Sequence, residues 1–162
     1  MTPATRTPPS IDLSMLLNQA SHAVTSRLSV ALADIGISVK VYCVLTKGVE
    51  GDFTQAQLAE RAWMDKSTMV NVLDEMERAA LAVRRLSPTD RRVRVVSITA
   101  KGRDLLKRAD ALVQAAYDDV LDTLPETDRS VFLSALSRLV EGPLVSPFHM
   151  EDQLIRTRRA KR

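Results

Sequence analysis

The sequence predicts a mainly α-helical fold that carries one small β-hairpin. Three observations support this class. The chain is rich in Ala and Leu, and only 4% of its residues are aromatic, which favours helix over sheet. Apolar residues recur at helical spacing on both sides of residues 54–99. Within that stretch, two β-prone runs flank the turn-forming sequence Ser87-Pro88-Thr89-Asp90, which predicts a hairpin.

The bulk properties limit the class of protein. With 162 residues, the chain is expected to form one domain around one core. No apolar run reaches membrane-spanning length, and the N-terminus lacks the basic and apolar regions of a secretory signal. The single cysteine, Cys43, allows no internal disulfide. We therefore expect a cytoplasmic protein with no membrane partner.

The first predicted element is a long helix. It follows a Pro- and Thr-rich segment, residues 1–10, which we expect to be a flexible arm. Ser10 or Asp12 is suited to cap the helix, and Gly36 is suited to end it. Its apolar stripe is wider than one small domain needs and consists of Leu13, Leu16, Leu17, Ala20, Val24, Leu28, Ala31, Leu32 and Ile35.

Shorter helices come next. Ser38 is expected to cap a helix over residues 39–47, and Thr54 the helix after it. A tight turn at Trp63-Met64 then leads to Asp65, the predicted cap of a helix over residues 66–80. The inward residues of this last helix are expected to be Met69, Val72, Leu73, Met76 and Ala80. Its outward residues are expected to be Lys66, Ser67, Val70, Asn71, Asp74 and Glu75.

The hairpin and two further helices complete the chain. Strands are predicted over residues 82–87 and 92–98. Thr99 is expected to cap a long helix to about residue 123, and another helix is expected from Pro125 to Gly142. The tail beyond it is basic at its end.

This order of elements predicts a winged helix-turn-helix. A short exposed helix fits the major groove of DNA, and an arginine-tipped hairpin reaches phosphates or the neighbouring minor groove. We expect a winged helix-turn-helix DNA-binding domain over residues 38–99. Residues 11–37 and 100–142, from both ends of the chain, are expected to form a helical dimerisation region, and residues 143–162 a C-terminal tail. The apolar faces of the end helices favour a homodimer.

The charge distribution agrees with a polyanion-binding face. The formal net charge is only +3, but residues 84–108 hold nine lysines and arginines against two aspartates. Such a cluster on a neutral body is typical of nucleic-acid-binding proteins. The alternative is a solvated helix and hairpin surface.

Three segments together resemble the MarR family of bacterial transcription regulators. They are Thr54–Leu81, the hairpin tip Asp90-Arg91-Arg92, and the run Ile98-Thr99-Ala100-Lys101-Gly102. With the order of the helices, the resemblance covers the chain from Leu13 to Gly142. It implies a regulator, most often a repressor, that binds a pseudo-palindromic double-stranded DNA operator as a homodimer. It also implies a small ligand, often aromatic or anionic, that changes DNA affinity by shifting the spacing of the two recognition helices.

The predicted DNA-contacting residues lie at the start of the helix over 66–80, along its outward face and on the hairpin. They are Lys66, Ser67, Thr68, Val70, Asn71, Arg91, Arg92 and Arg94. Asn71 has the amide that pairs bidentately with adenine. Ser67 and Thr68 are placed to meet phosphate, and the alternative is that they assist capping.

The hairpin residues have different expected roles. Arg92 is the predicted minor-groove contact. Asp90 is expected to brace the wing by pairing with an arginine. Arg94 is either a phosphate contact or a member of an ion pair.

One feature of the helix over 66–80 departs from the family. It holds Asp74, Glu75 and Glu77 against Lys66 and Arg78, and an acidic helix repels phosphates. This motivates an alternative function, a winged-helix protein-interaction module that no longer reads DNA.

Effector-binding candidates follow from the family's use of the first helix and the adjoining cavity. They are His22, Ser26, Arg27, Tyr42, Trp63 and Met64. The alternative for His22 is a solvent or dimer-interface position. The alternative for Tyr42, Trp63 and Met64 is a position in the core.

No other chemistry is expected. Cys43 lies in an apolar run and is interpreted as an inert, buried thiol rather than a redox sensor. Two histidines and one cysteine show no metal-ligand spacing, and no catalytic or cofactor motif is present. We therefore expect neither an enzyme nor a bound cofactor or metal.

Overall fold

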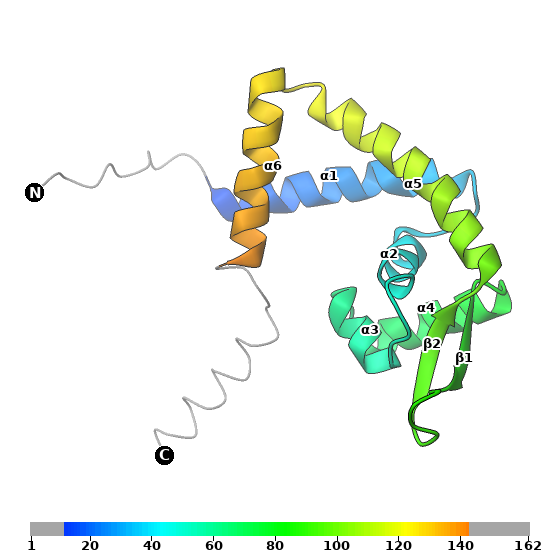
Figure 1. Ribbon diagram of the computed structural model, residues 1–162. Helices are drawn as coiled ribbons and strands as arrows, with labels where there is room; N and C mark the ends of the chain where they lie inside the picture. The colour runs from blue at the N-terminus through cyan, green and yellow to red at the C-terminus, as the bar shows by residue number, and fades with distance from the viewer. Residues whose placement is uncertain (1–11, 143–162) are drawn as a thin grey trace, which may run out of the picture. The chain divides into compact units, whose positions relative to one another are not determined.

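The computed structural model describes residues 12–142 and confirms the mainly helical class with one hairpin (Figure 1). The predicted arm and tail, and the possible cap Ser10, lie outside this range. The elements in order are α1 Leu13–Ala33, α2 Val39–Gly48, α3 Gln55–Arg61, α4 Lys66–Arg78, β1 Ala82–Leu86, β2 Arg94–Ile98, α5 Ala100–Leu121 and α6 Glu126–Glu141. None of these helices is both long and apolar enough to span a membrane.

Side-chain caps begin the first four helices at the predicted residues. The carboxylate of Asp12 accepts the Met15 N–H at 3.1 Å, and the Ser38 hydroxyl accepts a main-chain N–H of α2 at 3.2 Å. Thr54 begins α3 with a reciprocal capping box, in which the Gln57 side chain accepts the Thr54 N–H at 2.9 Å. These bonds satisfy main-chain donors that have no partner inside the helix.

The first of two compact units ends at Asp118 and contains the hydrophobic core. The inward stripe of α4 is buried, as predicted for Met69, Val72, Leu73 and Met76. It packs with buried side chains of the other elements, including Leu28, Leu32, Val41, Val44, Leu45, Leu58, Val96, Ile98, Leu106, Ala109 and Val113. The core therefore holds α4 by one face and leaves its other face open.

The end of α4 differs from the prediction. The helix stops at Arg78, and Ala80 is exposed, with a φ of 57° in the left-handed region, rather than buried on the inward stripe. The Leu81 N–H bonds to the Met76 carbonyl at 2.8 Å, and the Ala80 N–H bonds to the Glu77 carbonyl at 2.9 Å. This is a Schellman motif, which turns the chain sharply out of the helix and into β1.

Much of the predicted apolar stripe of α1 is not in this core. Leu28 and Leu32, at its C-terminal end, are buried, whereas Leu13 and Leu16 at its start are more than half exposed. In the second unit, no residue of α6 is buried, and its exposed apolar side chains are Val131, Phe132, Leu133, Leu139 and Val140. Each of the two helices thus exposes apolar side chains that its own unit does not cover.

The hairpin is attached to the helical body at its base. β1 and β2 pair antiparallel, from Ala82 opposite Ile98 to Leu86 opposite Arg94. The main-chain N–H of Val96 also donates to the carbonyl of Phe53 at 2.8 Å, which ties β2 to the segment before α3. The hairpin then projects beyond the helices (Figure 1). We call β1, β2 and the connecting residues 87–93 the wing.

Candidate nucleic-acid interface

The start of α4 is held by its cap. One carboxylate oxygen of Asp65 accepts the Thr68 N–H at 2.9 Å and the Ser67 hydroxyl at 2.5 Å. These hydrogen bonds, that from Ser67 first, hold the pKa of Asp65 well below its usual range. Ser67 and Thr68 therefore take the capping role that was one of their two expected roles, and Ser67 remains exposed.

The outward face of α4 presents a stripe of exposed side chains. Lys66, Val70 and Asn71 are exposed, as is Asp74 one turn further along. Residues three and four apart share a helix face, so these side chains form one surface. The Asn71 amide makes no side-chain hydrogen bond with any described residue, so its donors and acceptor are available to a partner.

The turn between α3 and α4 contains the chain's single tryptophan. Trp63 has a φ of 55° and a side chain that is 51% exposed, so the interpretation of Trp63 as a core residue is wrong. It occupies the left-handed position of a second Schellman motif, with its N–H bonded to the Glu60 carbonyl at 3.2 Å. This geometry directs the ring away from the core, whereas Met64 is half-buried and packs against the core.

The tip of the wing is ordered by Ser87 and Asp90. The Ser87 hydroxyl accepts the N–H groups of Thr89 and Asp90 at 3.3 and 3.4 Å. The Asp90 carboxylate accepts the Arg92 N–H at 2.9 Å, so Asp90 braces the tip through the main chain rather than through an arginine side chain. These bonds fix the loop that presents the arginines.

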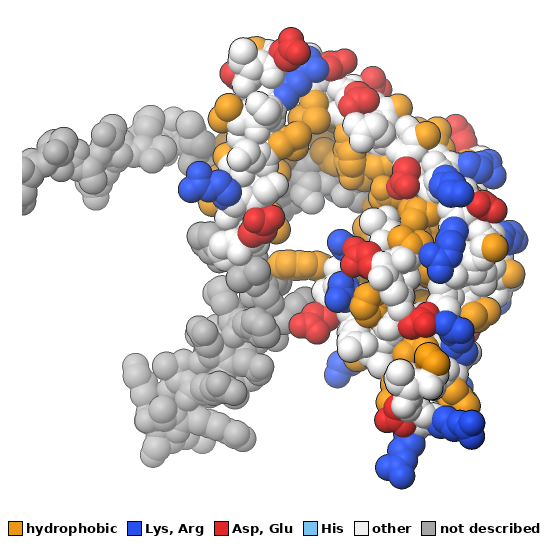
Figure 2. Space-filling model, in the orientation of Figure 1, with side chains coloured by type: hydrophobic (Ala, Val, Ile, Leu, Met, Phe, Trp, Pro, Cys, Tyr) orange, Lys and Arg blue, Asp and Glu red, His pale blue; other side chains and the backbone are white. Residues whose placement is uncertain are grey.

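Cationic side chains gather over the end of the wing (Figure 2). Arg91, Arg92 and Arg94 are exposed, and none of them forms an ion pair with a residue in the range 12–142. The wing therefore offers three free guanidinium groups, the preferred side chains for phosphate recognition.

The two arginines of β1 are used within the chain. Arg84 pairs with Asp74 and Glu77 of α4, and Arg85 pairs with Asp52. Two of the acids that made α4 unfavourable for DNA thus share the single positive charge of Arg84 in β1. Sequence reasoning missed these pairs; the only local signal was two arginines on a strand opposite an acidic helix.

The run from Ile98 to Gly102 connects β2 to α5 and bonds to the residues that end α4. The Thr99 hydroxyl donates to the Ala80 carbonyl at 2.8 Å and accepts the Gly102 N–H at 3.0 Å. The Lys101 ammonium donates to the Ala79 carbonyl at 2.8 Å, where a cation suits the helix C-terminus. The run over residues 98–102, one of the segments that resemble the MarR family, thus holds the end of α4 against the start of α5.

The effector candidates are spread over several elements. His22, Ser26 and Arg27 are exposed on α1, and Tyr42 is half-buried on α2. Among the described residues, no side-chain hydrogen bond or ion pair joins any of the six candidates to another. Tyr42 instead donates to Asp110 of α5 at 3.1 Å, and burial, followed by this contact, raises its pKa to about 12.

Cys43 is half-buried on α2. Burial raises the pKa of its thiol, which keeps it protonated near neutral pH. This is the environment expected of an inert thiol.

Comparisons with known proteins place this geometry in a family. The MarR family model matches residues 45–93. The chain is 30% identical over 128 residues to the HTH-type transcriptional repressor Rv2887 of Mycobacterium tuberculosis, covering 78% of this chain and 92% of that protein.

Solved structures agree. The crystal structure of CouR from Rhodococcus jostii RHA1, bound to p-coumaroyl-CoA, has a TM-score of 0.72 and 31% identity, and the match covers 83% of this chain and 94% of CouR. The structure of Rv2887 in complex with DNA has a TM-score of 0.69 and 27% identity, with 80% and 98% covered. The chain therefore belongs to the MarR family of winged helix-turn-helix transcription regulators.

Proposed function

We propose that this protein is a sequence-specific, double-stranded DNA-binding transcription regulator, acting as a cytoplasmic repressor without catalysis. The observation that carries the proposal is the surface shared by α4 and the wing. It combines an exposed helix face around Asn71 with Arg91, Arg92 and Arg94, which are exposed and form no ion pair within residues 12–142, on a hairpin fixed to the same body. The relative Rv2887 is a repressor and has been solved with DNA, which supports the same role here.

Each part of this surface has a proposed task. Lys66, Ser67 and Thr68 meet phosphate at the start of α4, where helix N–H groups favour an anion; the exposed Ser67 also donates its hydroxyl to the Asp65 cap. Val70 and Asn71 face the base edges in the major groove. Arg92 enters the minor groove, with Arg91 beside it and Arg94 on the backbone.

The functional unit is a homodimer. The uncovered apolar residues of α1, such as Leu13 and Leu16, and those of α6 are exposed in a single chain, and a second copy is the simplest cover for them. We assign α1, α5 and α6 to the dimerisation region and residues 38–99 to DNA binding. A two-fold dimer matches a pseudo-palindromic operator with half-sites about one helical turn apart.

A small ligand is proposed to change the DNA affinity. The relatives CouR and Rv2887 have been solved with p-coumaroyl-CoA and with salicylic acid, respectively, which are aromatic and anionic. For this chain, the candidates for ligand contact remain His22, Ser26, Arg27, Tyr42, Trp63 and Met64. The ligand would favour one of two dimer geometries and so change the separation of the two α4 helices.

The experiment is a mobility-shift assay on DNA upstream of the protein's own gene. The wild-type protein is expected to bind with an affinity that falls steeply with salt, because phosphate contacts release counterions. Arg92→Ala should weaken binding and flatten the salt dependence. Arg108→Ala is the matched control, because it removes an exposed arginine from α5 instead of the wing. Equal binding by wild type and Arg92→Ala would remove the wing from the mechanism.

The alternative function, a protein-interaction module, was motivated by the acidic character of α4. Pairing of Asp74 and Glu77 with Arg84 adds one positive charge beside α4 and weakens that motive. Failure of the protein to shift any genomic fragment, together with a stable complex in a pull-down, would favour the alternative.

A further inference from the structure

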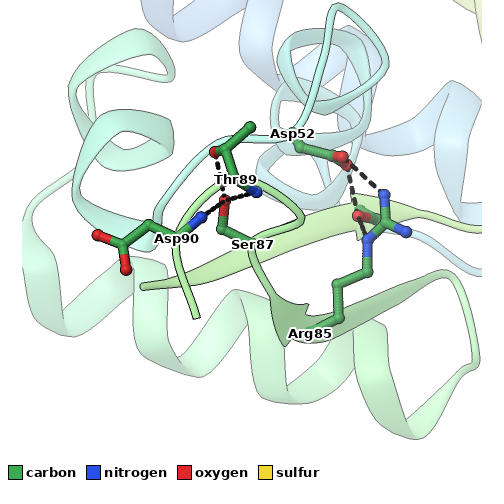
Figure 3. A network of polar contacts seen from close by, with 6 residues as sticks. Asp52, Arg85, Ser87, Thr89 and Asp90 are labelled. Atoms are coloured by element: carbon green, nitrogen blue, oxygen red, sulfur yellow. Dashed lines mark hydrogen bonds and ion pairs between the residues drawn. The ribbon is translucent and has the colours of Figure 1, made fainter. Parts of the chain in front are cut away.

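Two consecutive arginines attach the wing to the body from opposite sides. Successive side chains of a strand point to opposite faces, so Arg84 and Arg85 reach different elements. Arg84 pairs with Asp74 and Glu77 of α4. Figure 3 shows Arg85 directed toward Asp52, in the segment between α2 and α3. The wing therefore has a separate polar attachment on each face of β1.

The attachment to α4 uses three contacts of Arg84. Its guanidinium lies 2.8 Å from the Asp74 carboxylate and also pairs with the carboxylate of Glu77. Its main-chain N–H donates to Glu77 at 2.8 Å. The Arg84 side chain is 23% exposed and that of Glu77 is 33% exposed, whereas that of Asp74 is 52% exposed, so the pairing with Glu77 is the better shielded of the two.

The attachment on the other face is a closed triangle. The Asp52 carboxylate accepts the Ser97 hydroxyl at 2.5 Å and pairs with Arg85 at 2.6 Å, and Arg85 Nε donates to Ser97 at 2.7 Å. A rotation of the wing about its base would have to break polar contacts on one face or the other.

The Arg84 network also has an electrostatic consequence. Asp74 lies on the exposed stripe of α4, one turn beyond Val70 and Asn71. An unpaired carboxylate there would repel the phosphates on either side of a groove. Arg84 places a positive charge 2.8 Å from this carboxylate, and it is not one of the arginines at the end of the wing.

We propose that Arg84 is a positioning residue that locks the wing to α4 and partly offsets the charges of Asp74 and Glu77, so that helix and wing meet DNA as one rigid unit. This inference rests on the proposed DNA-binding function. It predicts that DNA affinity depends on Arg84 through Asp74 and Glu77, and not through a phosphate contact of Arg84 itself.

The test compares two arginine variants in two backgrounds. Arg84→Met keeps the aliphatic stem and removes the charge, and Arg94→Ala removes a free arginine from the neighbouring strand. Each is made in the wild type and in an Asp74→Asn/Glu77→Gln background, and the affinity for the bound genomic fragment is measured. Residues in one network are non-additive, so Arg84→Met should weaken binding about tenfold in the wild type but less than about twofold in the neutralised background. Arg94→Ala should cost the same in both.

Hydrogen exchange of the free protein provides a readout that needs no DNA. Amides of β1 and β2 should exchange faster in Arg84→Met than in wild type or Arg94→Ala, because the brace is lost. Unchanged exchange would show that Arg84 does not hold the wing to α4. Equal losses of affinity in the two backgrounds would show that Arg84 contacts phosphate itself and does not act through Asp74 and Glu77. If the wild-type protein binds no duplex, the proposed function fails, and the role of Arg84 in DNA binding fails with it. The hydrogen-exchange result would still show whether Arg84 holds the wing to α4.

Discussion

Replacing Gly102 with alanine perturbs the junction between α4 and α5 at its closest approach. An alanine Cβ there would lie 2.8 Å from Ile98 Cγ2 and 3.2 Å from the Leu81 carbonyl carbon, with the Leu81 carbonyl oxygen closer still. That oxygen already accepts the Thr99 N–H at 3.0 Å. Because the obstacle is hydrogen-bonded main chain, it cannot move aside as a flexible side chain would.

Two opposing effects set the size of the change in the free energy of unfolding. Alanine is favoured over glycine inside a helix by about 1 kcal/mol. Overpacking against a fixed neighbour costs about 1–3 kcal/mol, and contact with main chain belongs at the upper end of that range. We therefore expect a net loss of about 2 kcal/mol in the free energy of unfolding. For a chain of this size, that loss lowers Tm by about 4–8 °C.

Thermal unfolding followed by far-UV circular dichroism measures this loss. Gly36→Ala is the control, because Gly36 has a φ of 71° but no atom within 4 Å of an added Cβ. It should cost only the left-handed strain, about 1 kcal/mol. A Tm for Gly102→Ala that is no lower than the Tm of Gly36→Ala would contradict the tight contact at Gly102.

Two further predictions concern α4 and the wing. Ala80→Gly should raise the free energy of unfolding by about 1 kcal/mol in denaturant titrations, because glycine removes the strain of the left-handed position at the end of α4; a lower midpoint would contradict this account. The hydrogen bond from Ser97 and the pairing with Arg85 hold the pKa of Asp52 below its ordinary value. The ionised Asp52 therefore stabilises the wing above about pH 4, and this stabilisation is lost as the pH falls through the lowered pKa. The protection factors of the wing amides, which are exchange rates corrected for the slowing of chemical exchange at low pH, should therefore fall in acid in the wild type and change much less in Asp52→Asn. An identical pH dependence of the protection factors in both proteins would refute the role of Asp52.

Features that depend on a few neighbouring residues could be predicted from the sequence. Asp12, Ser38, Thr54 and Asp65 were identified as caps because each cap bonds to an N–H two or three positions later. The buried stripe of α4 followed from helical spacing in the same way.

Features that depend on how the chain turns could not be predicted. A left-handed residue after a helix is usually glycine, so Trp63 and Ala80 gave no sign that they occupy that conformation. The pairing of Arg84 with Asp74 and Glu77 depends on this turn at Ala80, because the turn lays β1 back against α4. Because these pairs could not be predicted, the sequence alone suggested more free positive charge on the wing and more unpaired negative charge on α4 than the structure has.

The most direct test of the account is the mass and footprint of the complex between the protein and its selected genomic duplex. Sedimentation should give two chains per duplex, and the footprint should show two protected half-sites whose centres are about one helical turn, 10–10.5 base pairs, apart. One chain per duplex, or protection of a single half-site, would contradict the proposal that a dimer presents paired α4 helices and wings to DNA.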